Sequence, residues 1–344
     1  MKHSLIIHFL LIISVIGSSQ TPQIAVVRPN GTTFICTTFD SAYSNANDDD
    51  FLYLPGGHFT ATNPIDKRIH IYGAGYYPDS SVTTGITTLN NVILHVGAED
   101  GSITGLRLDS WSCDHGSLLV GDALNLVPFS GFTLKTCWIS GGLTALVETT
   151  DFAIINCYIG NHGCGSPFSS IEGSFSNSIL NNSFISYQFM STYVMEFSSI
   201  NNNIFIVGGS DSYPQNIASN STYENNIFKA SPSNYYAVSN SIFTNNCNGA
   251  FSGTDNIFEN QVQEPIDSTF VTQGPFPNGY HVKTSSLCYQ SGTDGTDRGI
   301  YGGAFPNVEG AIPENPHVYF KQIDQVTGSD GRLHIQVGVR MNDD

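Results

Sequence analysis

The residues best suited to acid–base chemistry gather between residues 109 and 172 of this 344-residue chain. The densest polar run is Asp109-Ser110-Trp111-Ser112-Cys113-Asp114-His115, and Asp151 follows in the same region. Carboxylates beside a histidine can transfer protons or hold a metal ion. We therefore expect any catalytic site to contain Asp109, Asp114, His115 and Asp151. The alternative is that these residues are solvated loop charges.

A second group of candidates is a set of tyrosines between residues 187 and 236. An exposed tyrosine can stack on a neutral sugar ring and can donate a hydrogen bond through its hydroxyl. The candidate substrate-binding residues are Tyr187, Tyr193, Tyr213, Tyr223, Tyr235 and Tyr236. Alternatively, these rings pack against the surface of the fold.

The composition narrows the class of protein. The chain has 12 Lys and Arg residues against 29 Asp and Glu residues, a formal net charge of −17, and 40% hydrophobic residues. This hydrophobic content supports a packed core and excludes a disordered chain. The negative charge repels phosphate backbones and anionic lipids, so nucleic acids and membranes are excluded as expected partners.

Residues 1–19 have the organisation of a secretory signal peptide. Lys2 precedes an apolar run from Leu5 to Ile16, and small residues precede a cleavage point at Gln20. The apolar run has twelve residues, whereas about 20 are needed to span a bilayer. We therefore expect a secreted, extracellular or cell-surface protein without membrane insertion.

Seven cysteines follow this leader, and none of them forms the Cys-x-x-Cys spacing typical of zinc sites. In a chain of this length, cysteines are expected mainly as buried core residues. The alternative is that one or two disulfides form in an oxidising compartment, and the sequence assigns no pairing.

A short motif recurs from residue 136 to residue 259, in which a polar residue precedes a strand with an aromatic residue. The seven copies start at Thr136, Asn156, Asn182, Asn203, Asn226, Ser241 and Asn256. Repeats of about 20 residues are typical of a solenoid, whose stacked coils share one core. We predict an all-β right-handed parallel β-helix. Its inward-facing aromatic residues are expected to be Trp138, Tyr158, Phe184, Phe205, Phe228, Phe243 and Phe258.

Asparagine is concentrated in this repeat region, where 19 of the 30 asparagines lie between Asn156 and Asn260. Strands disfavour asparagine, whereas turns favour it because it tolerates left-handed backbone. An asparagine at the same turn of each coil can also hydrogen-bond to the asparagine one coil above. The sequence therefore predicts an asparagine ladder.

The segments on either side of the repeats are expected to close the solenoid. Residues 37–46 have the pattern of a short amphipathic helix, and Asp48-Asp49-Asp50, the strand Phe51–Leu54 and the turn Pro55-Gly56-Gly57 follow. This succession resembles the N-terminal part of pectate-lyase-like β-helix proteins. The stretches 67–80 and 291–303 resemble secreted bacterial β-helix proteins of unassigned activity. The resemblance covers residues 22–315 and implies a fold but no single activity, because this fold carries several.

The predicted organisation follows from these features. It is a signal peptide at residues 1–19, an N-terminal cap with the first coils at 20–88, the parallel β-helix at 89–290, a closing segment at 291–315 and a C-terminal β-hairpin tail at 316–344. The hairpin is indicated by two alternating apolar runs on either side of Ser329-Asp330-Gly331.

Three functions agree with this fold. The first is binding of a polysaccharide or cell-surface glycan without catalysis, because no known catalytic motif of β-helix enzymes is present. The second is a divergent polysaccharide lyase or glycoside hydrolase with a carboxylate and histidine site around 109–172. The third is a structural shaft or adhesion module. No cofactor is assigned, Ca²⁺ stays open, and a monomer is expected.

Overall fold

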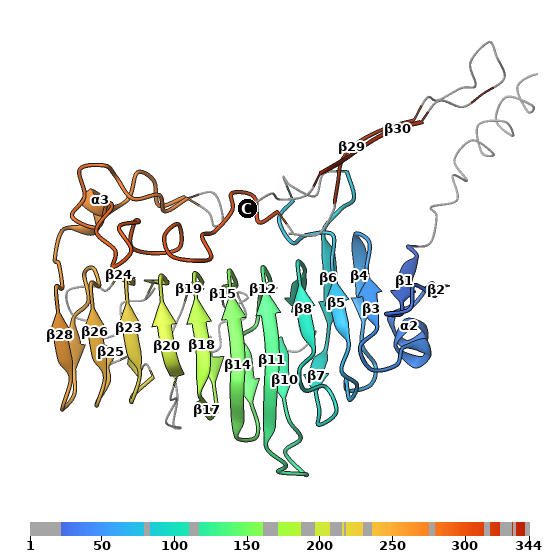
Figure 1. Ribbon diagram of the computed structural model, residues 1–344, viewed down its shortest axis with the longest axis horizontal. Helices are drawn as coiled ribbons and strands as arrows, with labels where there is room; N and C mark the ends of the chain where they lie inside the picture. The colour runs from blue at the N-terminus through green and yellow to red at the C-terminus, as the bar shows by residue number, and fades with distance from the viewer. Residues whose placement is uncertain are drawn as a thin grey trace, which may run out of the picture.

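The strands of this protein stack as the successive coils of a parallel β-helix (Figure 1). The computed structural model describes residues 22–78, 83–109, 117–160, 171–186, 197–206, 215–216, 218–229, 236–274, 279–312, 317–323, 332 and 335–340. Apart from two short helices, the regular structure in these residues is β. The predicted fold class is therefore confirmed.

The first side of the solenoid is a 13-stranded sheet. In chain order its strands are β1 (Ile24–Val27), β2 (Thr33–Cys36), β3 (Phe51–Tyr53), β5 (His70–Tyr72), β8 (Ser102–Thr104), β11 (Phe129–Lys135), β14 (Thr149–Ile155), β17 (Phe175–Ser176), β18 (Ser178–Asn181), β20 (Phe197–Asn201), β23 (Thr222–Glu224), β26 (Ile242–Thr244) and β28 (Ile257–Glu259). From β3 onward all of its pairings are parallel.

The second side is an eight-stranded parallel sheet, reached from the first by a tight corner. Its strands are β4 (Gly57–Thr60), β6 (Thr87–Asn90), β9 (Arg107–Asp109), β12 (Trp138–Ile139), β15 (Tyr158–Gly160), β19 (Phe184–Ser186), β21 (Ile204–Ile206) and β24 (Ile227–Lys229). The third side is split into two sheets. They contain β7 (Val92–Leu94), β10 (Leu118–Val120), β13 (Leu143–Ala145) and β16 (Ile171–Glu172), and then β22 (Gln215–Asn216), β25 (Tyr236–Ala237) and β27 (Phe251–Ser252).

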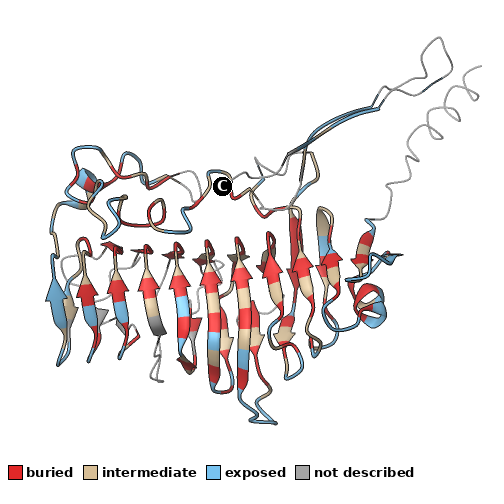
Figure 2. Cartoon of the chain, in the orientation of Figure 1, coloured by how far each residue is buried: buried red, intermediate tan, exposed pale blue. Residues whose placement is uncertain are grey.

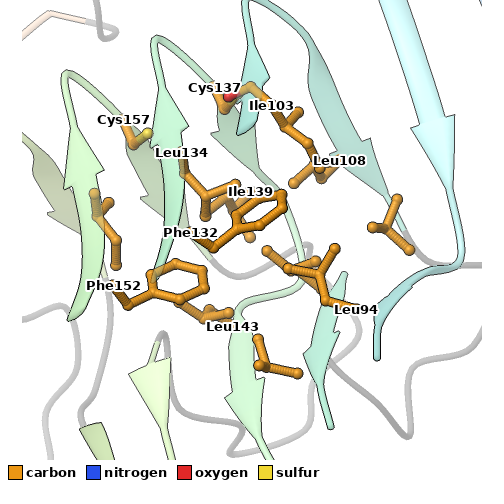
Figure 3. Close-up of a cluster of buried hydrophobic side chains, with 14 of the residues drawn as sticks. Leu94, Ile103, Leu108, Phe132, Leu134, Cys137, Ile139, Leu143, Phe152 and Cys157 are labelled. Atoms are coloured by element: carbon orange, nitrogen blue, oxygen red, sulfur yellow. The ribbon is translucent and has the colours of Figure 1, made fainter. Parts of the chain in front are cut away.

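One continuous core fills the inside of the coils. Figure 3 shows part of it, where Leu134 of β11, Ile139 of β12 and Leu143 of β13 point inward from the three sides. All three side chains are fully buried. Because alternate residues of a strand face opposite sides, each short strand contributes only one or two side chains to this core. A coil therefore gains its stability from its neighbours.

The tight corner between the first two sheets is built by residues with left-handed backbone. The same corner of successive coils is occupied by Thr136, Asn156, Asn182, Asn202, Asn225 and Asn245, with φ between 48° and 56°. Asparagine adopts this region more readily than other residues with a side chain. The concentration of asparagine in the repeat thus has a direct backbone cause.

The residue after each left-handed corner points inward and forms the predicted ladder. Asn226 Oδ1 accepts the main-chain N–H of Asn203 at 2.9 Å, and Asn246 Oδ1 accepts the main-chain N–H of Asn226 at 2.9 Å. The ladder continues toward the N-terminus, where Asn203 Oδ1 accepts the N–H of Ser183 and Ser183 Oγ accepts the N–H of Cys157. The asparagine ladder is confirmed.

The prediction that the seven motif aromatic residues face inward is confirmed for Phe205, Phe228 and Phe243 and wrong for Trp138, Tyr158 and Phe184. Trp138, Tyr158 and Phe184 stand in register on the outer face of the eight-stranded sheet, and the strand residue after each one faces the core. Phe184 pairs with Ile204, so Phe205 is shifted by one residue and points inward. A shift of one residue moves a side chain to the opposite face.

The remaining motif aromatic residues lie elsewhere. Phe228 pairs with Phe205 and is a core residue of the eight-stranded sheet. Phe243 and Phe258 belong to the 13-stranded sheet, where Phe243 pairs with Tyr223 on one side and with Phe258 on the other. Equal motifs in the sequence thus occupy two different sides of the solenoid.

The N-terminal end of the core is covered by a cap. Helix α2 (Phe39–Asn45) begins after Thr38, whose hydroxyl accepts the N–H of Ser41. Its buried residues Phe39, Ala42 and Tyr43 join the core cluster. The predicted helix and cap are therefore present.

The closing segment returns along the solenoid after helix α3 (Ile266–Thr269), as Figure 1 shows for the orange part of the chain. The disulfide Cys247–Cys288 attaches it to the last coils. The buried Arg298 guanidinium donates to the carbonyl oxygens of Asn246, Asn260 and Ser291. Cys36, Cys137 and Cys157 are buried free thiols, as expected for core cysteines.

The chain ends in an antiparallel hairpin of β29 (His317–Ile323) and β30 (Ile335–Arg340), which confirms the predicted tail. The hairpin projects away from the solenoid (Figure 1). Within the described residues, no helix is both long and apolar enough to cross a membrane. The expected signal peptide, residues 1–19, lies outside the described residues.

Candidate ligand-binding surface

The outer face of the eight-stranded sheet carries the most distinctive set of polar and aromatic side chains among the described residues. Successive strands place Thr88, Arg107, Trp138, Tyr158 and Phe184 side by side in one row. Outward residues are usually solvated in a β-helix. Here Thr88 and Phe184 are buried, and the side chain of Arg107 is only 17% exposed.

Arg107 is held by two different contacts. Its guanidinium Nη2 lies 2.8 Å from Asp109 Oδ2, and its Cζ lies 4.4 Å from the centre of the Trp138 ring. Asp109 Oδ1 in turn accepts the hydroxyl of Ser140 at 2.7 Å. A guanidinium that stacks on an aromatic ring and pairs with a carboxylate has a fixed orientation. The group formed by Arg107, Asp109, Trp138 and Ser140 is therefore pre-organised; we call it the Arg107 cluster.

The rings of this row pack against their neighbours along the solenoid. Trp138 has Arg107 on one side along the solenoid and Tyr158 on the other, with the two ring centres 5.5 Å apart. Both rings are half-buried. Trp138 carries an indole N–H and Tyr158 a phenolic O–H at the ring edge. This surface is therefore suited to hydrogen bonding.

Three buried polar atoms near Trp138 have no hydrogen-bond partner among the residues that the structure describes. They are Tyr76 Oη, Thr88 Oγ1 and Arg107 Nε. The Tyr76 ring packs edge-on against Trp138 at 6.5 Å, and Thr88 is the register neighbour of Arg107. Buried polar atoms are nearly always satisfied, so such a group indicates a place for water or a ligand.

The opposite end of the same row is closed. Phe184 is covered by Tyr280 of the returning segment, with ring centres 4.7 Å apart, and Tyr280 also packs on Phe270. Ile204 and Ile227 lie below Gly299, at a distance that leaves no space for a side chain there. The closing segment therefore covers the apolar half of the face and leaves the Arg107 cluster at its N-terminal end.

The structure separates the predicted catalytic residues. Asp109 ends β9 on the eight-stranded sheet, whereas Asp151 lies in β14 of the 13-stranded sheet. Asp151 is exposed, has left-handed backbone, and accepts hydrogen bonds from Asn177 and Thr150. Asp151 thus lies at a left-handed bend inside β14. Asp114 and His115 lie outside the described residues.

The structure describes two of the six tyrosines that were predicted to bind substrate. Tyr223 is a core residue, 1% exposed, whose hydroxyl donates to the carbonyl of Ala218 at 2.5 Å, so its assignment to a binding surface is wrong. Burial raises the pKa of its hydroxyl well above the usual value. Tyr236 lies in β25. The other four, Tyr187, Tyr193, Tyr213 and Tyr235, lie outside the described residues.

The sequence did not indicate that Arg107 and Trp138 lie on this face, or that Ser140 and Tyr76 are buried beside them. The sequence contained one indication for Trp138, namely that the aliphatic Ile139 follows it. Because alternate residues of a strand face opposite sides, an inward Ile139 places Trp138 on the outer face. The register of β9 with β12, which brings Arg107 over Trp138, depends on how each coil closes. Such pairing has no local signature.

Within the described residues, no group of three or more His, Cys, Asp or Glu side chains is placed to hold a metal ion. Asp294 accepts the N–H and the hydroxyl of Thr296, and these hydrogen bonds lower the pKa of its carboxyl group. Asp297 accepts the N–H of Gln290. Both aspartates therefore shape a turn.

No protein-family model matches this chain, and no curated protein matches it. The class is consequently defined by the architecture itself. The chain is a parallel β-helix protein with a capped N-terminal end, a disulfide-attached returning segment and the Arg107 cluster on one outer face.

Proposed function

We propose that this chain is a secreted or cell-surface β-helix protein that binds a polysaccharide at the Arg107 cluster. The observation that carries the proposal is the contact set of Arg107, which is paired with Asp109 and stacked on Trp138 while its Nε stays without a partner. A fixed guanidinium and carboxylate offer donors and acceptors to the hydroxyl groups of a sugar. The edges of Trp138 and Tyr158 add polar groups in the same row.

The overall charge favours a neutral glycan over a polyanion. The chain carries a formal net charge of −17, and Arg107 is already neutralised by Asp109. An acidic polymer would be repelled at long range and would have to displace the Asp109 pairing. A neutral polysaccharide is not repelled by the negative charge and leaves the ion pair between Arg107 and Asp109 in place.

Two features support export from the cell. The leader pattern at residues 1–19 is one, and the disulfide between Cys247 and Cys288 is the other. Disulfides persist in oxidising compartments and are rare in reducing ones. A glycan-binding role agrees with a location outside the cell, where polysaccharides are accessible.

The test is binding of the protein from residue 20 onward to a panel of neutral and acidic polysaccharides, with and without Ca²⁺, by affinity electrophoresis and calorimetry. We expect retardation by a neutral glycan and loss of about tenfold or more in affinity for Arg107→Ala. The conservative Arg107→Lys keeps the charge but loses the planar stacking group, so intermediate affinity is expected.

Asp109→Ala and Asp151→Ala form a matched pair, because both remove a candidate aspartate but from different sheets. Binding that weakens for Asp109→Ala and not for Asp151→Ala would support the Arg107 cluster. Equal effects would contradict it. Release of reducing ends or unsaturated uronates from any polymer would contradict the non-catalytic function. Cleavage lost in Asp109→Ala would instead support the carbohydrate-active enzyme.

A further inference from the structure

None of the described residues covers the C-terminal end of the solenoid, whereas a cap covers the N-terminal end. The edge strand β28 is exposed at all three of its residues, and Figure 2 shows it in pale blue at one end of the stack. Phe258 is the last ring of a core stack. It lies 5.0 Å from Phe243 and 5.6 Å from Phe251, yet is 48% exposed. An inward aromatic residue without a covering coil is an apolar surface that needs a partner.

The backbone of this edge is available for a further strand. Ile257 N–H donates to Ser241, and Glu259 accepts the N–H of Asn245, so these two residues face the preceding coil. By the alternation of a parallel ladder, the N–H and C=O of Phe258 point to the free edge. Edges of this kind are templates for pairing with another chain.

The terminal hairpin also exposes apolar side chains. It forms a sheet of two strands only, and an isolated two-stranded ribbon is marginally stable in water. One of its faces carries four apolar residues that are 44–60% exposed, namely Ile323, Ile335, Val337 and Val339, with Lys321 opposite Val337. Figure 2 shows the hairpin as largely exposed.

The charges of the two elements are opposite. β29 and β30 contain Lys321 and Arg340 and no acidic residue. The open edge carries the exposed Asp255 and Glu259 and no basic residue. In a chain with a net charge of −17, pairing of two acidic edges is unfavourable, whereas pairing of this hairpin with this edge is favoured.

β28 lies at one end of the long axis, whereas the hairpin rises above the N-terminal coils and slants toward the other end (Figure 1). They are therefore separated within one chain, so that a second copy is needed to bring a hairpin to the open edge. We propose that copies of this chain associate head to tail, the hairpin of one adding to β28 of the next and covering Phe258. Such a heterologous contact continues into filaments. This proposal replaces the expectation of a monomer and is independent of the glycan site.

The experiment measures molar mass by light scattering and sedimentation over a range of concentrations, using two full-length variants that alter exposed side chains. Phe258→Lys blocks the edge with a charge that repels the hairpin. Val337→Glu with Val339→Glu blocks the apolar face of the hairpin. The unaltered chain is expected to grow in mass with concentration, and each variant alone is expected to stay at the mass of one chain.

Mixing the two variants separates head-to-tail association from the alternatives. Each variant keeps one functional end, so the mixture should form a 1:1 complex and nothing larger. The absence of a complex, or growth of either variant alone, would overturn the proposal.

A charge reversal on the edge supplies a second, milder test. Glu259→Lys should weaken association about tenfold, because it removes part of the negative charge of the edge. Association that is unchanged in Glu259→Lys would contradict the charge complementarity. An unaltered chain that keeps the mass of one chain at every concentration would contradict the association itself.

Discussion

The side-chain oxygen of Asn226 accepts both the main-chain N–H and the side-chain N–H of Asn203 from the neighbouring coil, at 2.9 and 3.0 Å. Asn226 also donates through Nδ2 to the carbonyl of Ile200 and to Asn246 Oδ1. All donors and acceptors of this buried amide are thus used between coils. The ladder couples each coil to the next at the corner where the backbone is left-handed.

Asn226→Ala should lower the free energy of unfolding by about 2 kcal/mol, because the buried N–H of Asn203 and the carbonyl of Ile200 lose their partners. Urea unfolding followed by circular dichroism measures the change. Asn63→Ala, which removes an exposed amide bonded to Thr62, is the control and should change stability by less than about 0.5 kcal/mol. Equal effects of both substitutions would contradict a structural role for the ladder.

Thr136 occupies the left-handed corner that asparagine occupies in the following coils, with φ of 49°. A β-branched residue is strained there. Thr136→Asn should therefore stabilise the fold by about 1 kcal/mol, seen as a higher midpoint of thermal unfolding. Thr133→Asn in the regular part of β11 is the matched control and should not stabilise. A lower midpoint for Thr136→Asn would contradict the strain.

The disulfide between Cys247 and Cys288 closes a loop with a sequence separation of 41. Replacing both cysteines by alanine should cost about 4 kcal/mol from chain entropy alone. Denaturant unfolding with and without reductant measures this cost. Reductant should destabilise the natural chain and leave the double variant unchanged. A natural chain insensitive to reductant would show that the bridge contributes nothing.

His70 links stability to pH through its partial burial between strands. Its ring stacks on Phe51, and its Nδ1 lies 2.9 Å from Ser102 Oγ. Desolvation by burial lowers the pKa of His70 in the folded state. The unfolded chain therefore binds the proton more tightly, and stability is highest above the unfolded pKa of about 6.5 and falls as the pH drops below it.

Unfolding at pH 5 and pH 7.5 tests this linkage. We expect the stability lost between these values to be smaller for His70→Gln than for the natural chain. His58→Gln, an exposed histidine on β4, is the control and should leave the pH dependence unchanged. A pH dependence that is identical for His70→Gln and the natural chain would contradict the assignment.

Repetition and backbone chemistry made the general fold predictable. Asparagines at regular steps report the left-handed corners, and the cap helix starts at Thr38 because a threonine hydroxyl satisfies a free N–H. Both signals are local. The hairpin was predictable in the same way, since β29 and β30 alternate around turn residues.

The binding surface was less predictable, because it depends on register between coils. Phe184 and Phe205 follow similar motifs but face opposite sides, since coil lengths differ and β19 pairs Phe184 with Ile204. Tyr223 resembles a loop tyrosine in the sequence and is a core residue in the structure. A register shift of one residue moves a side chain to the opposite face of the sheet, and no local sequence pattern predicts this shift.

The amino-acid sequence by itself determined that this chain is acidic, repetitive, rich in left-handed asparagine corners and built as stacked coils. These properties depend on residue type and short spacing, which act within one coil. Only the tertiary structure decided that Arg107 stacks on Trp138, that Asp109 and Asp151 lie in different sheets, and that Phe258 ends an open core. Those relationships arise from pairing between coils, where the packing of the whole stack selects one register.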